Sequence, residues 1–156
     1  MCRQLTMDSK IFFNTRKKVK RSKPRIFITA SFQEDKNKQE IEQLCELVNS
    51  AGFNDFCFIR DIEQYQKTFD DPVELMNRAR KEIEKSEYLL IDMTDKPTGR
   101  AIEAGMAYAL GKKVIVIMKR GTQIKDTTRG ISTAVIEYDK IDNIVESLAK
   151  IYSGKL

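Results

Sequence analysis

The acidic side chains with the clearest chemical potential are Asp92, Asp95 and Glu103, which fall within one short stretch of the chain. Asp92 ends an apolar run, and Asp95 follows it in a turn. Glu103 lies about one turn into a small-residue helix predicted over residues 100–110, on the same face as apolar side chains. A carboxylate on an apolar stripe costs free energy unless it faces a cleft or a partner. Glu103 is therefore a candidate for chemistry, with Asp92 and Asp95 beside it.

The position of Glu103 is expected to keep this side chain ionised. The partial positive charge at a helix N-terminus stabilises a nearby anion by about 0.3–1 kcal/mol, and Thr98 is the predicted N-cap of this helix. An ionised carboxylate suits a nucleophile. The spacing alone favours a structural role, because glutamate is common near a helix start and can pair with Arg100. Asp92 and Asp95 have a similar alternative, as caps of the helix that follows.

Other candidate ligand-binding residues lie in two further loops. Ser31 and Phe32 follow the first predicted strand, where they either contact a ligand or only form a turn. Lys125 and Arg129 lie in a polar loop predicted over residues 119–132. A guanidinium such as Arg129 can bind a phosphate group through two parallel hydrogen bonds. The competing interpretation of this loop is a solvated basic surface.

The hydrophobic pattern predicts five strands that alternate with helices, and these elements position the candidate residues. Apolar or β-branched runs predict the strands, and apolar residues at helical spacing predict the helices. Such alternation is typical of an α/β domain with a five-stranded parallel sheet between two helical layers. Ligands bind such sheets at the carboxyl ends of the strands, so we expect a site formed by loops 31–36, 92–100 and 119–130. The predicted strands are 25–31, 56–59, 88–93, 113–118 and 134–138, and the predicted helices are 36–51, 71–85, 100–110 and 141–152.

Composition narrows the chemistry further. The chain of 156 residues suits a single domain, and it contains no histidine, so histidine-based catalysis is excluded. Its three cysteines, Cys2, Cys45 and Cys57, have the spacing of neither a disulfide framework nor a zinc site. Neither a secretory signal nor an apolar run of membrane-spanning length is apparent. We expect a cytoplasmic protein that needs no metal or redox cofactor.

The basic charge is concentrated at the N-terminus. Residues 1–24 contain eight Lys and Arg and one acidic residue, Asp8, whereas the whole chain has a net charge of +5. The remaining residues 25–156 are therefore slightly acidic and form the predicted domain. The composition of the first 24 residues favours a flexible, solvated tail over an arm that binds nucleic acid or a membrane.

The stretch Glu103-Ala-Gly-Met-Ala-Tyr-Ala-Leu-Gly111, preceded by a strand ending in Asp92, resembles the signature of the nucleoside 2-deoxyribosyltransferase superfamily. The loop 120–130 is more similar to the branch of 2′-deoxynucleoside 5′-phosphate N-hydrolases. The resemblance covers roughly residues 25–140. It implies a flavodoxin-like (Rossmann-like) fold and a homodimer whose sites share residues across the interface.

The resemblance also implies a function for the candidate residues. Glu103 falls at the position of the glutamate that attacks the anomeric carbon, and Thr98 and Gly99 fall where related hydrolases hold the substrate phosphate. The expected activity is hydrolysis of the N-glycosidic bond of a (deoxy)nucleoside 5′-monophosphate through a glycosyl-Glu103 intermediate, or transfer of the sugar to another base. Asp92 or Asp95 would protonate the departing base, and Arg100, Lys125 and Arg129 favour a phosphorylated substrate.

Several departures from the family pattern leave alternatives open. Asn77 stands near the position of a family acid, the segment Ala30-Ser31-Phe32 stands where the first-strand motif usually carries glycine, and Lys125 replaces a serine that helps to bind phosphate. These changes favour a non-catalytic nucleotide-binding module as the main alternative. A phosphoacceptor receiver domain is a weaker one, because Asp92 has the expected strand-end position but the acidic pair after the first strand is lacking.

Overall fold

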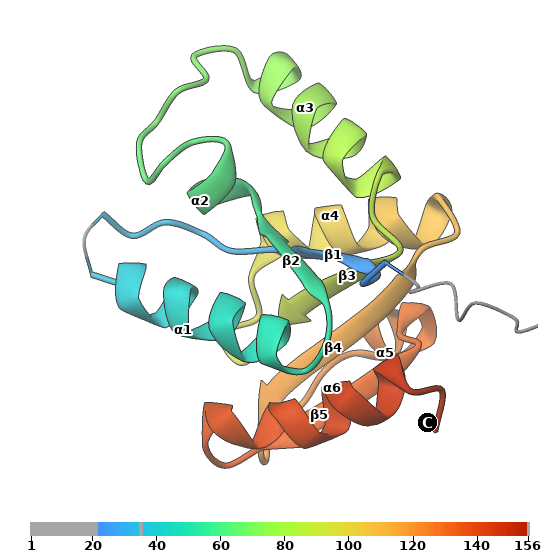
Figure 1. Ribbon diagram of the computed structural model, residues 1–156. Helices are drawn as coiled ribbons and strands as arrows, with labels where there is room; N and C mark the ends of the chain where they lie inside the picture. Colours follow the sequence, from blue (N-terminus) through green and yellow to red (C-terminus); the bar gives the residue numbers. More distant parts are fainter. Residues whose placement is uncertain (1–21, 35, 156) are drawn as a thin grey trace, which may run out of the picture.

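The computed structural model describes residues 22–34 and 36–155, which fold around one parallel sheet (Figure 1). The spatial order of the strands is β2-β1-β3-β4-β5, which is the flavodoxin-like order. The sequence prediction of a five-stranded parallel sheet is thus confirmed. The predicted tail lies outside the described residues except for Ser22–Pro24. The strands are β1 Arg25–Ile28, β2 Asn54–Cys57, β3 Tyr88–Asp92, β4 Lys113–Lys119 and β5 Ala134–Tyr138.

Helices cover both faces of the sheet and form two hydrophobic cores. Helices α1 and α6 enclose one core, and α3 and α4 enclose the other (Figure 1). In β3 the residues alternate between the cores: Leu90 faces the first, whereas Leu89 and Ile91 face the second. This explains why the strand is apolar from Tyr88 to Ile91. The helices are α1 Lys38–Ser50, α2 Phe58–Asp61, α3 Pro72–Glu84, α4 Thr98–Ala109, α5 Asp126–Ile131, the 3₁₀ turn η1 Ile141–Asn143, and α6 Ile144–Tyr152.

Local signals at two helix ends are confirmed. Asp71 caps α3, because its side chain accepts a hydrogen bond of 2.9 Å from the backbone N–H of Val73, and Pro72 occupies the first helical position. Gly52 ends α1 with a φ of +111°, and a side chain there would meet the ring of Tyr152 within 3.1 Å. Only glycine satisfies both the backbone angle and the close approach.

Three local predictions are wrong. Residues 56–59 do not form one strand, because β2 ends at Cys57 and the short helix α2 begins at Phe58; Asp61 accepts a hydrogen bond of 2.9 Å from the N–H of Cys57 and so closes this turn. The polar loop 119–132 contains α5, which is too short for its periodicity to stand out. Thr98 is the first residue of α4, not its N-cap, and Pro97 precedes it without a side-chain cap.

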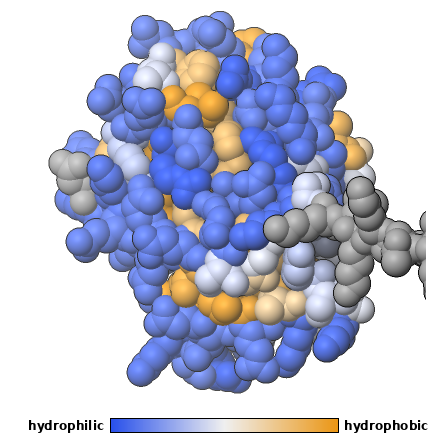
Figure 2. Space-filling model, viewed as in Figure 1, coloured by the Kyte–Doolittle hydropathy of each residue, from blue (hydrophilic) through white to orange (hydrophobic). Residues whose placement is uncertain are grey.

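The surface seen in Figure 2 is largely hydrophilic, with a band of hydrophobic side chains between α1 and α6. Leu47 and Val145 are among the half-buried residues that pack on the core between these two helices. Among the residues that the structure describes, no helix is both long and apolar enough to cross a membrane.

Candidate active site

A cleft of about 400 Å³ opens at the carboxyl edge of the sheet. It lies where the order of strands reverses between β1 and β3, which is the expected place for a ligand in such a sheet. Loops after β1, β3, β4 and β5 supply its walls. Residues on these walls include Thr29, Ser31, Asp92, Asp95, Lys119 and Tyr138, and Arg100 reaches it from α4.

Asp92 is held firmly in the wall of this cleft. One carboxylate oxygen accepts a hydrogen bond of 2.8 Å from the backbone N–H of Thr94, and the other accepts one of 2.7 Å from the hydroxyl of Tyr138. Burial, together with the hydrogen bond to Asp92, raises the pKa of Tyr138 to about 12. The phenol therefore stays protonated and continues to donate. Both carboxylate oxygens of Asp92 are thus already engaged with donors, which suits this side chain to shaping the wall of the cleft.

Arg100 connects the cleft to Glu103. Its Nη1 donates a hydrogen bond of 3.3 Å to the backbone carbonyl of Asp92, while its Nε is buried without a partner. Arg100 lies one turn before Glu103 on α4, and its positive charge acts to lower the pKa of that carboxyl. The guanidinium thus contacts the end of β3 and lies near enough to the predicted nucleophile to affect its pKa.

Glu103 is half-buried and makes no hydrogen bond or ion pair with any residue in the described part of the chain. Burial raises its pKa to about 7; Arg100 opposes this shift and Glu63 adds to it. The expectation that the helix N-terminus keeps Glu103 ionised is therefore wrong at neutral pH, because the loss of solvent outweighs the helix and Arg100.

Glu63 is a second acid near Glu103 that the sequence interpretation missed. Burial raises its pKa as well, and it belongs to the loop between α2 and α3. Two residues of this loop, Gln64 and Tyr65, have positive φ angles of 50° and 60°, which are uncommon for residues other than glycine. The sequence held no signal for this residue, since it lies in a polar segment without periodicity.

Aromatic contacts fix the loop that carries Glu63. The ring centroid of Tyr65 lies 5.6 Å from that of Phe32, and the Tyr65 hydroxyl donates a hydrogen bond to Glu42 of α1. Phe32, predicted to meet a ligand, is thus half-buried against Tyr65 and is not among the residues that line the cleft. It links the loop after β1 to the loop of Glu63.

The structure brings only some of the predicted site residues together. Ser31, Asp92, Asp95 and Arg100 line the cleft, and Glu103 adjoins it through Arg100 without lining it. Four other predicted residues are exposed and are absent from the lining of the cleft. Thr98 and Gly99 form the first turn of α4, Lys125 precedes α5, and Arg129 lies within α5.

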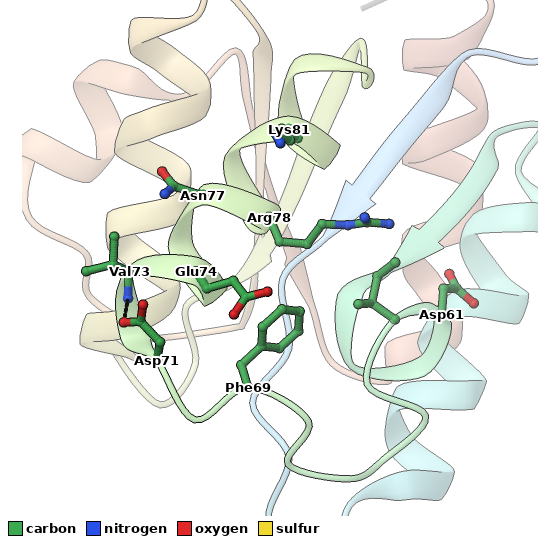
Figure 3. A pocket seen from close by; sticks show the side chains of 9 residues that line it. Asp61, Phe69, Asp71, Val73, Glu74, Asn77, Arg78 and Lys81 are labelled. Atoms are coloured by element: carbon green, nitrogen blue, oxygen red, sulfur yellow. Dashed lines mark hydrogen bonds between the residues drawn. The ribbon is translucent and has the colours of Figure 1, made fainter.

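A second, more open hollow of about 730 Å³ lies between α2 and α3. Figure 3 shows Glu74 pointing toward the ring of Phe69 and Arg78 extending past this ring toward the segment of Asp61, whereas Asn77 points away from the ring. Asn77 is thus exposed on the rim of this hollow, not on the wall of the cleft at the strand ends. Within residues 22–34 and 36–155, no three or more Cys, Asp or Glu side chains group in a way that could hold a metal ion.

Comparison with known proteins yields structural matches only. No family model and no curated protein matches the sequence. The CMP N-glycosidase BcmB from Clostridium botulinum is 21% identical, with a TM-score of 0.59, over 80% of this chain and 97% of its own. A 2-deoxyribosyltransferase from Bacillus psychrosaccharolyticus is 16% identical, with a TM-score of 0.61, over 80% and 95%. The resemblance noted in the sequence thus extends to the fold.

The fold is not restricted to these enzymes. A response regulator receiver protein from Burkholderia phymatum is 14% identical, with a TM-score of 0.52, over 86% of this chain and 98% of its own. Such likeness establishes a shared flavodoxin-like architecture, and the function must be argued from the residues of the site.

Proposed function

We propose that the protein cleaves the N-glycosidic bond of a nucleoside 5′-monophosphate, with Glu103 as the nucleophile. The observation that carries this proposal is a half-buried carboxyl group that pairs with no described residue and adjoins, through Arg100, a cleft at the carboxyl edge of the sheet. Burying an acid without a partner is costly, and such groups gather at functional sites.

In the proposed mechanism, a carboxylate oxygen of Glu103 attacks C1′ as the bond from C1′ to the base breaks. The base leaves with the bonding electron pair and takes up a proton, and the sugar becomes esterified to Glu103. Water then attacks C1′, releases the sugar phosphate and restores the carboxylate. This two-step path is the retaining-glycosidase mechanism. A transferase would use a second base in place of water.

The proton for the leaving base comes from one of three acids. Asp92 and Asp95 line the cleft, but both oxygens of Asp92 already accept hydrogen bonds. Glu63 has the property that a general acid needs, since burial raises its pKa. We therefore rank Glu63 and Asp95 above Asp92 as proton donors, and we assign Asp92 a role in shaping the cleft and orienting Arg100.

The phosphate group is assigned to the first turn of α4. The backbone N–H groups of Thr98 and Gly99 have no partner within the helix, and such a turn attracts anions. Gly99 has open space at its Cβ position, so a phosphate could approach the backbone closely. Arg100 adds positive charge beside it. Lys125, which precedes α5, and Arg129, within α5, do not line the cleft. They would help to bind the phosphate only through long-range electrostatic attraction.

The test is to incubate the purified protein with a panel of ribonucleoside and deoxyribonucleoside monophosphates and to measure free base. We expect base release that the Glu103→Gln variant loses by about a hundredfold or more, because the nucleophile is gone. Release at wild-type rates from Glu103→Gln, with the variant shown to be folded, would remove Glu103 from the mechanism.

A non-catalytic nucleotide-binding module is the second candidate. Asn77 favours this function, because the family usually has an acid near this position in the sequence and because Asn77 lies away from the cleft wall. Calorimetry that detects monophosphate binding, together with no base release from any substrate of the panel, would select this function. The binding would then depend on the first turn of α4 and on Arg100.

We also propose that the protein forms a homodimer through the outer surface of α3 and α4. Ile102 is 59% exposed and Val73 is 66% exposed, and exposed apolar side chains that gather on one surface mark interaction sites. Gly105 presents no side chain on α4, and a Cβ atom there would meet nothing within 4 Å. A second copy could therefore approach this helix closely.

A further inference from the structure

Two buried polar atoms at the cleft have no hydrogen-bond partner. They are Oγ1 of Thr29 and Nε of Arg100, and within residues 22–34 and 36–155 no other buried side-chain nitrogen or oxygen is left unpaired. Both residues line the cleft, and Thr29 is only 2% exposed. Leaving a buried polar group unpaired costs free energy. In the described protein this cost is concentrated at one place, the proposed ligand site.

A hydroxyl group at position 29 has no evident packing purpose. Thr29 directly follows the fully buried residues Ile26, Phe27 and Ile28 of β1. Valine has the same shape and suits a strand end without carrying an unpaired hydroxyl. A polar atom in this setting points to a ligand group that supplies the missing partner.

The chemistry of the two atoms defines this ligand group. The Nε–H of Arg100 can only donate, whereas the hydroxyl of Thr29 can donate or accept, so the group must offer an acceptor oxygen. Four carboxylates, Glu40, Asp92, Asp95 and Asp139, line the same cleft against two cations, Arg100 and Lys119, and this excess of negative charge disfavours an anion at this depth. A sugar hydroxyl fits this combination, because it can accept from Arg100 and also donate to Thr29 or to a carboxylate.

The place of Arg100 selects the hydroxyl. Arg100 lies one helical turn before Glu103, and Glu103 is proposed to attack C1′. The ring hydroxyl nearest to C1′ is the one on C2′, and hydrogen bonds to it strengthen in the transition state of glycoside cleavage. We propose that Thr29 and Arg100 bind the 2′-hydroxyl of a ribosyl substrate, so that the protein prefers ribonucleotides to 2′-deoxyribonucleotides. This inference rests on the proposed function.

The experiment compares matched pairs of ligands that differ only in the 2′-hydroxyl. The full chain with Glu103→Gln, which prevents turnover, is titrated by calorimetry with CMP and dCMP, AMP and dAMP, and GMP and dGMP. We expect at least one ribonucleotide to bind about fivefold or more tightly than its deoxy partner, which is the effect of one net hydrogen bond. Adding Thr29→Val should bring this ratio close to one, whereas Thr29→Ser, which keeps the hydroxyl, should retain most of it.

Two results would overturn the inference: equal affinities for every pair, or a ribonucleotide preference that Thr29→Val leaves intact. Base release by the wild-type protein is measured separately, so the two claims can fail independently. If the wild-type protein releases base but binds the paired ligands equally, the 2′-hydroxyl contact is wrong and the proposed function stands. If the ribonucleotide preference depends on Thr29 but no base is released, the 2′-hydroxyl contact stands and the proposed glycosidase activity is wrong.

Discussion

Tyr138 of β5 donates a hydrogen bond of 2.7 Å to Asp92 of β3, although another strand, β4, separates them in the sheet. The same hydroxyl lies 3.3 Å from Oγ1 of Thr94, and the N–H of Lys119 donates to that Oγ1 over 3.0 Å. Three strand ends are thereby joined at the wall of the cleft. The orientation of Asp92 therefore depends on an edge strand that is remote from it along the chain.

We predict that Tyr138→Phe lowers both stability and activity. The variant removes a buried hydrogen bond to a carboxylate, which contributes about 1.5–3 kcal/mol, and it frees Asp92 to rotate in the cleft wall. Urea denaturation should report the loss of stability, and base release should fall severalfold. Tyr152→Phe is the matched control, because Tyr152 is 46% exposed. Equal stability and equal base release in the two variants would contradict the role of the Tyr138 hydroxyl.

The pH dependence of base release should follow the ionisation of Glu103. The nucleophile must be a carboxylate, and the pKa of Glu103 is raised to about 7. We therefore expect kcat/KM to rise as pH increases from 5 toward 7, and to fall at higher pH where the acid that protonates the base loses its proton, since this constant reports the groups of the free enzyme. A value of kcat/KM that is flat or falls between pH 5 and 7 would contradict the assignment of Glu103 as nucleophile.

Glu103 should also lower stability at alkaline pH. Because its folded pKa lies above its ordinary value of 4.5, the folded protein binds more protons than the unfolded chain between these values, and stability falls as pH rises from about 4.5 to 7. Glu103→Gln should therefore stabilise the protein at pH 8 by about 1–3 kcal/mol and have little effect at pH 4. Urea titrations at both pH values measure this, with exposed Glu46→Gln as the control. A stabilisation that is equal at both pH values would show that ionisation is not its cause.

Glu82 is predicted to be the main acid-sensitive contact. It is 3% exposed and forms ion pairs with Arg25 at 2.8 Å, Lys85 at 2.9 Å and Arg78 at 3.3 Å. Burial alone would raise its pKa, but Lys85 and Arg25 hold it below its usual value. Its contribution is therefore present above pH 4.5 and is lost as pH falls through the lowered pKa.

Removing the charge of Glu82 should lower the free energy of unfolding much more than removing an exposed charge. We expect Glu82→Gln to destabilise the protein at pH 7 by about 3 kcal/mol, because three cations at the amino edge of the sheet lose their partner. Glu84→Gln, which breaks only the pair with Arg80 on the surface, should cost less than about 1 kcal/mol. Thermal unfolding of the two variants at pH 7 and pH 3 measures the difference. Similar losses of stability in both variants would refute the special role of Glu82.

Ile102→Lys should separate the proposed homodimer into monomers. The substitution places a charge at the centre of the apolar surface of α4, where a desolvated cation opposes association. Sedimentation should detect a halved mass, whereas Gln39→Lys on α1, at the opposite face of the sheet, should leave the mass unchanged. A wild-type protein that is monomeric at all concentrations would rule out the dimer itself.

Much of the architecture could be predicted from local patterns. Continuous apolar runs identify β3 and β4 because both faces of these strands are buried, and Asp71-Pro72 marks the start of α3 through capping. Short helices such as α2 and α5 were missed, because one turn or two is too short for periodicity. The order of the strands was implied only through the flavodoxin-like fold of the family resemblance, since the hydrophobic pattern does not encode which strands are neighbours.

The site was less predictable, because its properties depend on contacts between distant segments. Asp92, Asp95 and Glu103 stood out by type and spacing. The role of Glu63 depends on a strained loop that Tyr65 ties to Phe32, and the raised pKa of Glu103 depends on how deeply α4 packs. Thr29 looked like an ordinary strand residue until the missing partner of its hydroxyl became visible in three dimensions.

Both ends of the described chain meet at residues 52–54, away from the cleft. The carbonyl of Pro24 accepts a hydrogen bond of 2.9 Å from the N–H of Asn54, and the ring of Tyr152 lies 5.8 Å from that of Phe53. A protein anchored to a bead or an electrode through its C-terminus would therefore present the cleft to the surrounding solution.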